Sequence, residues 1–187
     1  MYFGLSEDQI FFQDNVKKFL EDNAPLDAIK KITEGADLST KDELHQGLIN
    51  LGINNILIPE ENGGLGLDLL FASAVSQSLG EGIATLPFVG PYVIAPIAIK
   101  YGASDSQKEK LFNAMSQNLI NCGVGFSEYF GSRDSSDLSI SNNKITGRTL
   151  FVLDVDFASH VMLCDKKGQI GLVSLESQGI EIIDLTT

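Results

Sequence analysis

The sequence has little of what metal and nucleic-acid sites require. It contains only two cysteines and two histidines, and Cys122, Cys164, His45 and His160 do not stand at the spacings typical of metal ligands. Its 13 basic residues form no block, and 25 acidic residues outnumber them, for a net charge of −12. We therefore expect no metal site and no nucleic-acid partner.

Long apolar runs are also missing. No stretch reaches the roughly 20 apolar residues that a membrane-spanning helix needs. The first residues, MYFGLSEDQIFFQDNVKK, lack the basic and apolar regions of a secretory signal. We expect no membrane span and a cytoplasmic location. With 43% hydrophobic and 20% charged residues, the composition is that of a protein that folds around a core.

Two capping boxes mark expected helix starts near the beginning of the chain. Ser6 and Gln9 precede an apolar stripe that ends at Pro25, and Thr40 and Glu43 precede a second stripe. We predict a helix after each box. An extended apolar piece, INNILIPEENGGLGLD, is expected to follow the second helix.

Helix signals continue as far as residue 119. Asp68 is placed to cap a helix that ends at Gly80, and Ser104 or Ser106 can begin a later one. Between them, PFVGPYVIAPIAIKYG is almost entirely apolar but contains prolines. This stretch therefore predicts a buried helix with an interruption.

From Ile120 onward the pattern changes to short β-type runs. INCGVGF, KITGRTLFVLD, HVMLC, QIGLVSL and IEIIDL are separated by turn-forming residues, and Asn142 and Asn143 suit a tight hairpin turn. We predict an α+β protein, with an all-helical domain over residues 1–119 and an antiparallel, barrel- or sandwich-like β domain over residues 120–187. Since these strands are few for a closed barrel, we expect the β domain to be incomplete.

The residue pattern by itself assigns no catalytic residue. Glu60 and Glu61 lie in a glycine-rich turn, where adjacent acids are usually solvated, and GGLGLD lacks the lysine and the spacing of phosphate-binding loops. The segment GFSEYFGSRD, at 125–134, follows the first β run and offers amides and hydroxyls that suit a flat heterocycle or a pyrophosphate. Its composition alone favours an ordinary loop.

Seven segments of the chain follow one another in an order that carries a resemblance. They are LSEDQ, ILIPEENGGLGLD, LGEGIATLPF, YGASDSQKEKLF, GFSEYFGSRD, KITGRTLFVLDVDFASHVML and IDLTT. Together they resemble the N-terminal and middle portions of the acyl-CoA dehydrogenase family, in a divergent branch. The resemblance implies a flavoprotein with FAD against the middle domain, which dehydrogenates an acyl-CoA substrate between its α and β carbons. It also implies an electron-transferring flavoprotein or similar acceptor, and a homo- or hetero-oligomer.

The resemblance further implies which residues contact the flavin. Phe126, Ser127 and Glu128 match the family's segment along the flavin ring, with Ser127 as a hydroxyl donor. Phe151 matches an aromatic residue near the flavin. Leu153 stands at a flavin-contacting position where many members carry a threonine, so a hydrogen bond to the flavin is lost there.

Two further residues lie where the family has the pair Gly-Ser, in a stretch that touches the cofactor pyrophosphate or the substrate. We expect Ser132 to bind the cofactor and Arg133 to bind acyl-CoA. Family members continue into a C-terminal helical bundle that carries the usual catalytic glutamate, which this sequence lacks. We therefore expect a truncated or split acyl-CoA dehydrogenase. A non-catalytic partner subunit with the same fold, or a fragment without activity, remains an alternative.

Overall fold

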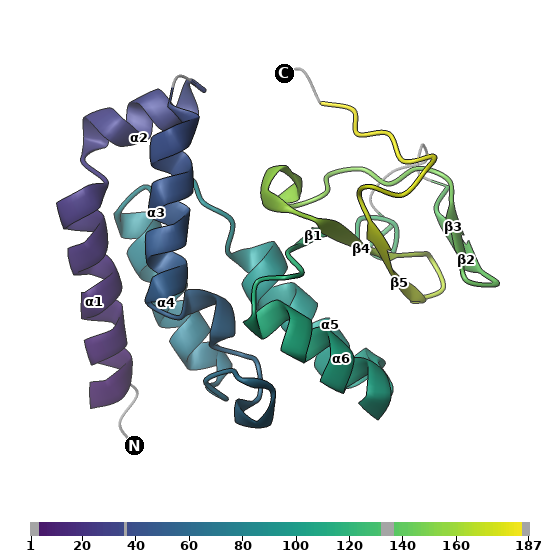
Figure 1. The fold of residues 1–187 in the computed structure, drawn as a ribbon, viewed down its shortest axis with the longest axis horizontal. Coiled ribbons are helices and arrows are strands. Elements are labelled where there is room, and N and C mark those ends of the chain that lie inside the picture. The colour runs from purple at the N-terminus through teal and green to yellow at the C-terminus, as the bar shows by residue number, and fades with distance from the viewer. Residues whose placement is uncertain (1–3, 36, 132–136, 185–187) are drawn as a thin grey trace. The chain divides into compact units, whose positions relative to one another are not determined.

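The computed structural model of this chain describes residues 4–35, 37–131 and 137–184. The chain divides into two compact units, Met1–Leu119 and Ile120–Thr187. The first unit is helical and the second contains two small β-sheets (Figure 1). The predicted α+β fold class is therefore confirmed.

Helices account for most of the described part of the first unit. The α-helices are α1 (Glu7–Asn23), α2 (Leu26–Thr33), α3 (Leu38–Asn50), α4 (Leu69–Glu81), α5 (Ala95–Gly102) and α6 (Asp105–Ser116). Between them lie two 3-10 turns, η1 (Ile53–Asn55) and η2 (Glu60–Asn62), and a π-helix, η3 (Val89–Ile94). Of the helices in the described ranges, none combines the length and the apolar character needed to cross a membrane.

Three of the predicted helix starts are confirmed. The amide of Gln9 donates to the Ser6 hydroxyl at 3.2 Å, and the amide of Ser6 donates to the Gln9 side chain at 2.9 Å. Ser104 and Gln107 form the same reciprocal pair at the start of α6, and Asp68 caps α4. These bonds satisfy backbone amides that have no partner within the first turn of a helix.

The predicted capping box at Thr40 and Glu43 is wrong. Asp37 caps α3 instead, and its carboxylate accepts hydrogen bonds from both the amide (3.0 Å) and the hydroxyl (2.7 Å) of Thr40. Thr40 is therefore the third residue of the helix. Helix α2 was not predicted, and it begins directly after Pro25, whose fixed φ suits the residue preceding a helix.

The segment between α3 and α4 was predicted to be extended, which is also wrong. It contains η1 and η2, and it folds back on itself, since the amides of Leu65 and Leu67 donate to the carbonyls of Asn55 and Ile56, both at 2.8 Å. Gly64 has a steric role here, because a Cβ at this position would collide with the carbonyl of Ile58. The asparagines favour local turns over the extended backbone that the apolar residues suggested.

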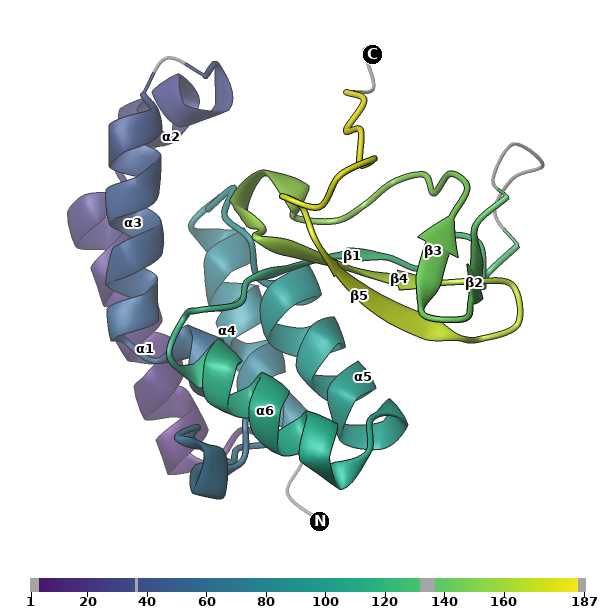
Figure 2. The same cartoon turned by 45° about the vertical axis from the view of Figure 1, so that its right-hand side comes forward.

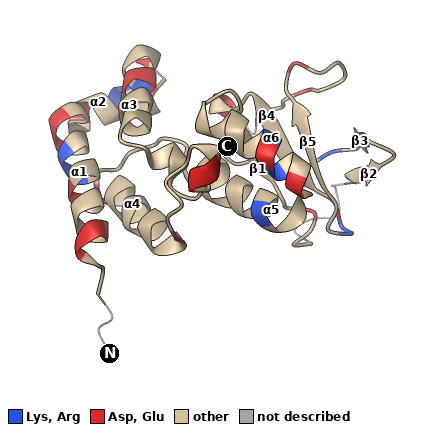
Figure 3. Cartoon of the chain, turned by 60° about the horizontal axis from the view of Figure 1, so that its bottom comes forward, with Lys and Arg blue, Asp and Glu red and all other residues tan. Residues whose placement is uncertain are grey.

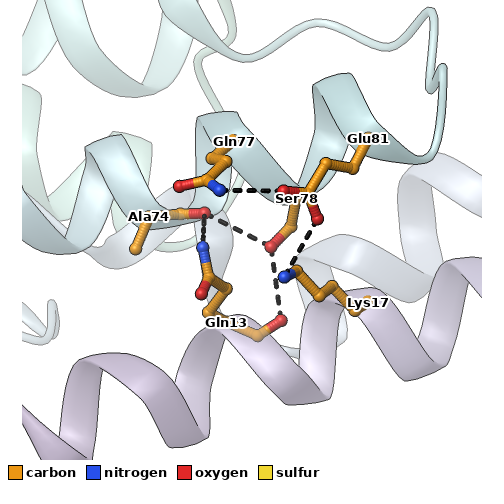
Figure 4. Close-up of polar contacts among 6 residues, drawn as sticks. All are labelled: Gln13, Lys17, Ala74, Gln77, Ser78 and Glu81. Atoms are coloured by element: carbon orange, nitrogen blue, oxygen red, sulfur yellow. Dashed lines mark hydrogen bonds and ion pairs between the residues drawn. The ribbon is translucent and has the colours of Figure 1, made fainter. Parts of the chain in front are cut away.

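Helices α1 and α4 pack side by side (Figures 1 and 2). Figure 4 shows the polar contacts that cross this interface. The side chain of Gln13 donates a hydrogen bond to the carbonyl of Ala74 at 3.2 Å. The hydroxyl of Ser78 donates a hydrogen bond to the carbonyl of Gln13 at 3.3 Å. Lys17 and Glu81 form a 2.9 Å salt bridge at its edge. The small side chains of Ala74 and Ser78 allow this close approach. The buried apolar residues of the two helices include Val16, Leu20, Val75 and Leu79.

The interrupted apolar helix is confirmed as η3 followed by α5. Pro91 lies within the π-helix, where its missing amide hydrogen disturbs the regular bonding pattern. Tyr92 is 3% exposed, and its hydroxyl lies 2.8 Å from Nε2 of His45 in α3. Burial lowers the pKa of His45, with Lys41 adding to the effect and Asp42 opposing it.

The second unit contains a three-stranded sheet and a hairpin. The sheet has the order β1 (Cys122–Gly125), β4 (His160–Cys164), β5 (Ile170–Ser174), and the hairpin consists of β2 (Ser139–Ser141) and β3 (Lys144–Thr146). Strands β4 and β5 are antiparallel, as predicted, but β1 and β4 are parallel. The long crossover connection between β1 and β4 permits this arrangement. Within the described residues the strands do not close into a barrel.

The predicted hairpin turn is confirmed. Asn142 and Asn143 have φ values of 50° and 58°, as a two-residue hairpin turn requires, and Ser141 pairs with Lys144. The predicted strand IEIIDL is wrong for the part that the structure describes, residues 180–184. Ile182 and Ile183 are 55% and 61% exposed, so the apolar pattern there does not reflect burial in a sheet.

Candidate functional site

The end of β1 and the segment that follows it lie beside residues 149–153, with an antiparallel bridge between Val124 and Leu153. Val124 and Leu153 exchange two backbone hydrogen bonds, of 3.0 and 2.8 Å. The Ser127 hydroxyl donates a hydrogen bond to the carbonyl of Leu150 at 2.8 Å. Ser127 lies three residues after Val124, and Leu150 lies three residues before Leu153. Both contacts join the same two stretches of chain, residues 124–127 and residues 150–153. The two segments therefore run side by side beyond the end of the strand.

These contacts bring together the residues that the sequence singled out. Along the two segments, Phe126 and Phe151 lie between the bridge of Val124 with Leu153 and the contact of Ser127 with Leu150. Phe126 is half-buried, whereas Phe151 and Leu153 are 49% and 47% exposed. Phe151 also has a φ of 56°, a strained conformation for a bulky residue. Exposed apolar side chains and local strain together are typical of binding sites.

Glu128 connects the two segments from the inside. Its side chain is 1% exposed, and one carboxylate oxygen accepts a 2.7 Å hydrogen bond from the hydroxyl of Thr149. The Ser127 hydroxyl lies 3.2 Å from the other oxygen, although its closest acceptor is the carbonyl of Leu150. A buried carboxylate requires such donors. Sequence reasoning missed Thr149, because nothing in the local pattern links it to a glutamate 21 positions earlier.

The two cysteines are poor nucleophiles. Burial raises the pKa of Cys122 to about 12. Burial also raises the pKa of Cys164, and the negative charges of Asp165 and Glu128 raise it further. Since the thiolate is the reactive form, neither residue is suited to covalent catalysis. In the parts of the chain that the structure covers, no group of three or more His, Cys, Asp or Glu side chains could hold a metal ion.

The other sequence candidates lie elsewhere. Ser132 and Arg133 fall outside the described residues. Glu60 and Glu61 are exposed in η2 of the helical unit, as expected for solvated acids. The site that the structure assembles therefore consists of residues 124–128 and 149–153 of the β unit.

The chain therefore combines a helical unit with a β unit that carries the site of residues 124–128 and 149–153. Residues 6–118 match the family model described as acyl-CoA dehydrogenase, N-terminal domain. The chain belongs to the acyl-CoA dehydrogenase family. A search of curated proteins found no match.

Solved structures show the same fold. An acyl-CoA dehydrogenase complexed with FAD from Bacillus anthracis is 17% identical with a TM-score of 0.74, over 98% of this chain and 34% of its own. Butyryl-CoA dehydrogenase from Megasphaera elsdenii is 18% identical with a TM-score of 0.70, over 96% and 51%. The ChsE4–ChsE5 complex from Mycobacterium tuberculosis is 16% identical with a TM-score of 0.68, over 96% and 49%. The chain spans between about a third and about half of the length of the solved structures it matches.

Proposed function

We propose that this chain forms the N-terminal and middle part of an FAD-dependent acyl-CoA dehydrogenase, which introduces a double bond between the α and β carbons of an acyl-CoA thioester. Family membership supports this class of activity. The observation that carries the proposal is the contact between residues 124–128 and residues 149–153, because the expected flavin contacts Phe126, Ser127, Phe151 and Leu153 all lie in these two segments. An electron-transferring flavoprotein or similar acceptor, and assembly into an oligomer, belong to the same proposal.

The paired segments fit one side of a flavin ring. Phe151 and Leu153 offer exposed apolar side chains, which a flat ring can cover. Ser127 can act as a donor only if its proton turns from the carbonyl of Leu150, 2.8 Å away, toward the ring. In this proposal Ser132 contacts the cofactor pyrophosphate and Arg133 contacts acyl-CoA.

FAD, when bound, would supply an acceptor for the two electrons that leave the β carbon of the substrate as hydride. The proton of the α carbon must pass to a carboxylate base within hydrogen-bond reach. Glu128 does not suit this role, because its carboxylate is buried and bonded to the Thr149 hydroxyl. Glu60 and Glu61 are exposed in the helical unit. We therefore propose that the base lies outside this sequence, in the same or in a second polypeptide.

A non-catalytic partner subunit is the second candidate, and the side chains facing the proposed ring favour it. Leu153 has no hydrogen-bonding group, and the Ser127 hydroxyl already donates to a backbone carbonyl. A chain of this fold could then contribute structure to an assembly whose flavin lies on another chain. One solved structure with this fold is a complex, ChsE4–ChsE5.

The test is flavin content and its reduction in the native assembly. The tagged chain is recovered from its own cells under non-denaturing conditions, and its visible spectrum is recorded before and after a panel of acyl-CoA thioesters is added. A dehydrogenase shows flavin bands that bleach with at least one thioester. The same purification is carried out with Phe151→Ala, and with Tyr101→Ala, which removes an 80% exposed ring of the helical unit, as the control.

The two candidates predict different results for these variants. If this chain holds the flavin, Phe151→Ala lowers the flavin content about tenfold, since stacking on a flat ring contributes about 1–3 kcal/mol, and Tyr101→Ala does not. A colourless assembly contradicts the proposal. Flavin content that Phe151→Ala leaves unchanged favours the partner subunit.

A further inference from the structure

The sequence contains one Asn-Gly pair, Asn62 and Gly63. Such a pair is chemically reactive, because glycine has no side chain to hinder attack of its amide nitrogen on the asparagine side chain. Asn62 is the last residue of η2, and Gly63 follows it with a φ of 81°. This positive φ accounts for the glycine, since other residues seldom adopt it. The geometry of the turn therefore introduces a reactive pair into the loop between α3 and α4.

The backbone of the folded loop keeps the two reacting atoms apart. A 3-10 turn has ψ values of about −20 to −30°, and ring closure requires Asn62 to rotate away from this range. The Gly63 amide donates a hydrogen bond to the carbonyl of Glu60 at 3.0 Å, which holds the proton that the nitrogen must lose before it attacks. The amides of Asn62 and Gly64 both donate to the carbonyl of Pro59, also at 3.0 Å. The reaction therefore requires the turn to open.

The neighbouring helix holds the side chain of Asn62. Its Nδ2 donates a hydrogen bond to Oδ1 of Asn113 in α6 at 3.0 Å, and both side chains are partly buried. The nitrogen that donates this bond is also the group that leaves in the reaction. The contact opposes movement of the Asn62 side chain toward the Gly63 amide. It therefore couples the reactivity of Asn62 to the packing of η2 on α6.

We propose that Asn62 is a modification site that deamidates when the loop between α3 and α4 opens, and that the folded loop suppresses the reaction. The Gly63 amide nitrogen loses its proton to a solvent base and bonds to Cγ of Asn62. The Cγ–Nδ2 bond breaks, and Nδ2 takes up a proton from solvent and leaves as ammonia. Water then opens the resulting succinimide ring to aspartate or isoaspartate. The reaction needs only water and a base, so the inference does not depend on flavin binding.

Both products disfavour refolding of the loop. Aspartate at position 62 replaces the Nδ2 donor with an oxygen, which faces the side-chain carbonyl of Asn113. It also adds a negative charge beside Glu60 and Glu61, in a unit that already carries acidic segments on α1 and α6 (Figure 3). Isoaspartate lengthens the main chain by a methylene group, inside a turn that closes on the carbonyls of Pro59 and Glu60. The modification therefore marks chains whose loop has opened.

Peptide mapping of the full chain by mass spectrometry tests this site. Deamidation of the peptide that contains Asn62 is followed at mildly alkaline pH, in native buffer and in concentrated guanidinium chloride. We expect the unfolded chain to react more than about tenfold faster, because the folded loop must first open. Fragmentation of the product should reveal isoaspartate, which only the succinimide route supplies. Equal rates in the two solutions, or no deamidation of Asn62 in the unfolded chain, would overturn the inference.

A pair of matched variants tests the contact with α6. Asn113→Ala removes the acceptor for Asn62 and should raise the native rate about fivefold, since the loss of one hydrogen bond favours opening by that factor. The control is Asn50→Ala in α3, which removes an acceptor of the same kind, because Nε2 of Gln46 donates to Oδ1 of Asn50 at 3.0 Å. The control should keep the native rate, and both variants should match the wild type when unfolded. A native rate that Asn113→Ala leaves unchanged, or that Asn50→Ala raises equally, would overturn the role of this contact.

Discussion

The hydroxyl of Thr149 donates a 2.7 Å hydrogen bond to the carboxylate of Glu128, whose side chain is 1% exposed. The two residues belong to different segments, one following β1 and the other preceding the bridge at Leu153. Their bond therefore fixes one segment against the other, and with it the surface proposed for the flavin. A hydrogen bond to a charged group of this kind contributes about 1.5–3 kcal/mol.

Replacing Thr149 by valine removes this donor while keeping the side-chain shape. We expect the free energy of unfolding of the β unit to fall by about 2 kcal/mol, because the buried carboxylate loses one hydrogen-bond donor. Hydrogen exchange of the β1 and β4 amides, followed by mass spectrometry, measures the loss. Thr149→Ser keeps the donor and should retain most of the protection. Equal exchange in the wild type and Thr149→Val would show that the bond does not hold the segments together.

The buried pair of His45 and Tyr92 makes the stability of the helical unit depend on pH. Burial lowers the pKa of His45 below its ordinary value of 6.5, so the unfolded chain binds the proton more readily than the folded one. Stability is then complete above about pH 6.5 and decreases as the pH falls toward the lower folded value. Urea unfolding at pH 7.5 and 5.5 should show this loss in the wild type, and much less of it in His45→Gln.

A control variant keeps His45 buried and removes the hydroxyl of Tyr92 that contacts it. Tyr92→Phe deletes the hydroxyl that lies 2.8 Å from Nε2, and it should lower stability at both pH values. Its pH dependence should remain, since burial is the main cause of the lowered pKa. If His45→Gln were as pH-dependent as the wild type between pH 7.5 and 5.5, the assignment to His45 would be wrong.

Ile83 ends α4 in a left-handed conformation, with a φ of 52°. The amide of Ala84 donates to the carbonyl of Leu79 at 2.9 Å, and that of Ile83 to the carbonyl of Gly80 at 3.1 Å, which is a helix ending that favours glycine. Because left-handed backbone costs a non-glycine residue about 1–2 kcal/mol, Ile83→Gly should stabilise the helical unit by about 1 kcal/mol. The midpoint temperature of thermal unfolding should rise by a few degrees. Ile83→Val keeps the left-handed strain and should not raise the stability of the helical unit. An equal rise in stability for Ile83→Val would exclude strain as the cause.

Two glycines of the helical unit should respond to alanine in opposite directions. A Cβ at Gly64 would collide with the backbone carbonyl of Ile58, whereas nothing lies within 4 Å of one at Gly80 in α4. Gly64→Ala should destabilise the unit by about 2–3 kcal/mol through overpacking. Gly80→Ala should stabilise it by about 0.5–1 kcal/mol, because alanine favours the helix. Urea unfolding of both variants measures the difference, and a stabilising Gly64→Ala would contradict the loop geometry.

The sequence predicted the elements whose signals are local. The caps at Ser6, Asp68 and Ser104 lie within three residues of the amides they satisfy, and the turn at Asn142 and Asn143 depends only on their tolerance of positive φ. Local chemistry therefore determined these boundaries. At α3 two capping signals competed, and the carboxylate of Asp37 took the amide of Thr40.

Features that depend on distant contacts were not predictable in the same way. The parallel pairing of β1 with β4 depends on how the chain between them crosses over, which short periodic runs do not specify. The bond between Glu128 and Thr149 likewise needs the register of two separate segments. Phe126, Ser127, Phe151 and Leu153 came from a family resemblance, and their roles at a flavin remain predictions.

Hydrogen exchange of the full chain with and without millimolar FAD tests the central claim most directly. The account predicts slower exchange in peptides that cover residues 124–131 and 149–154, and unchanged exchange in α4 (Leu69–Glu81). Ser127→Ala should weaken the effect, and Ser139→Ala in β2 should not. Two results would contradict a flavin site on the paired segments. FAD would leave hydrogen exchange unchanged in both peptides, or it would slow exchange only in the helical unit.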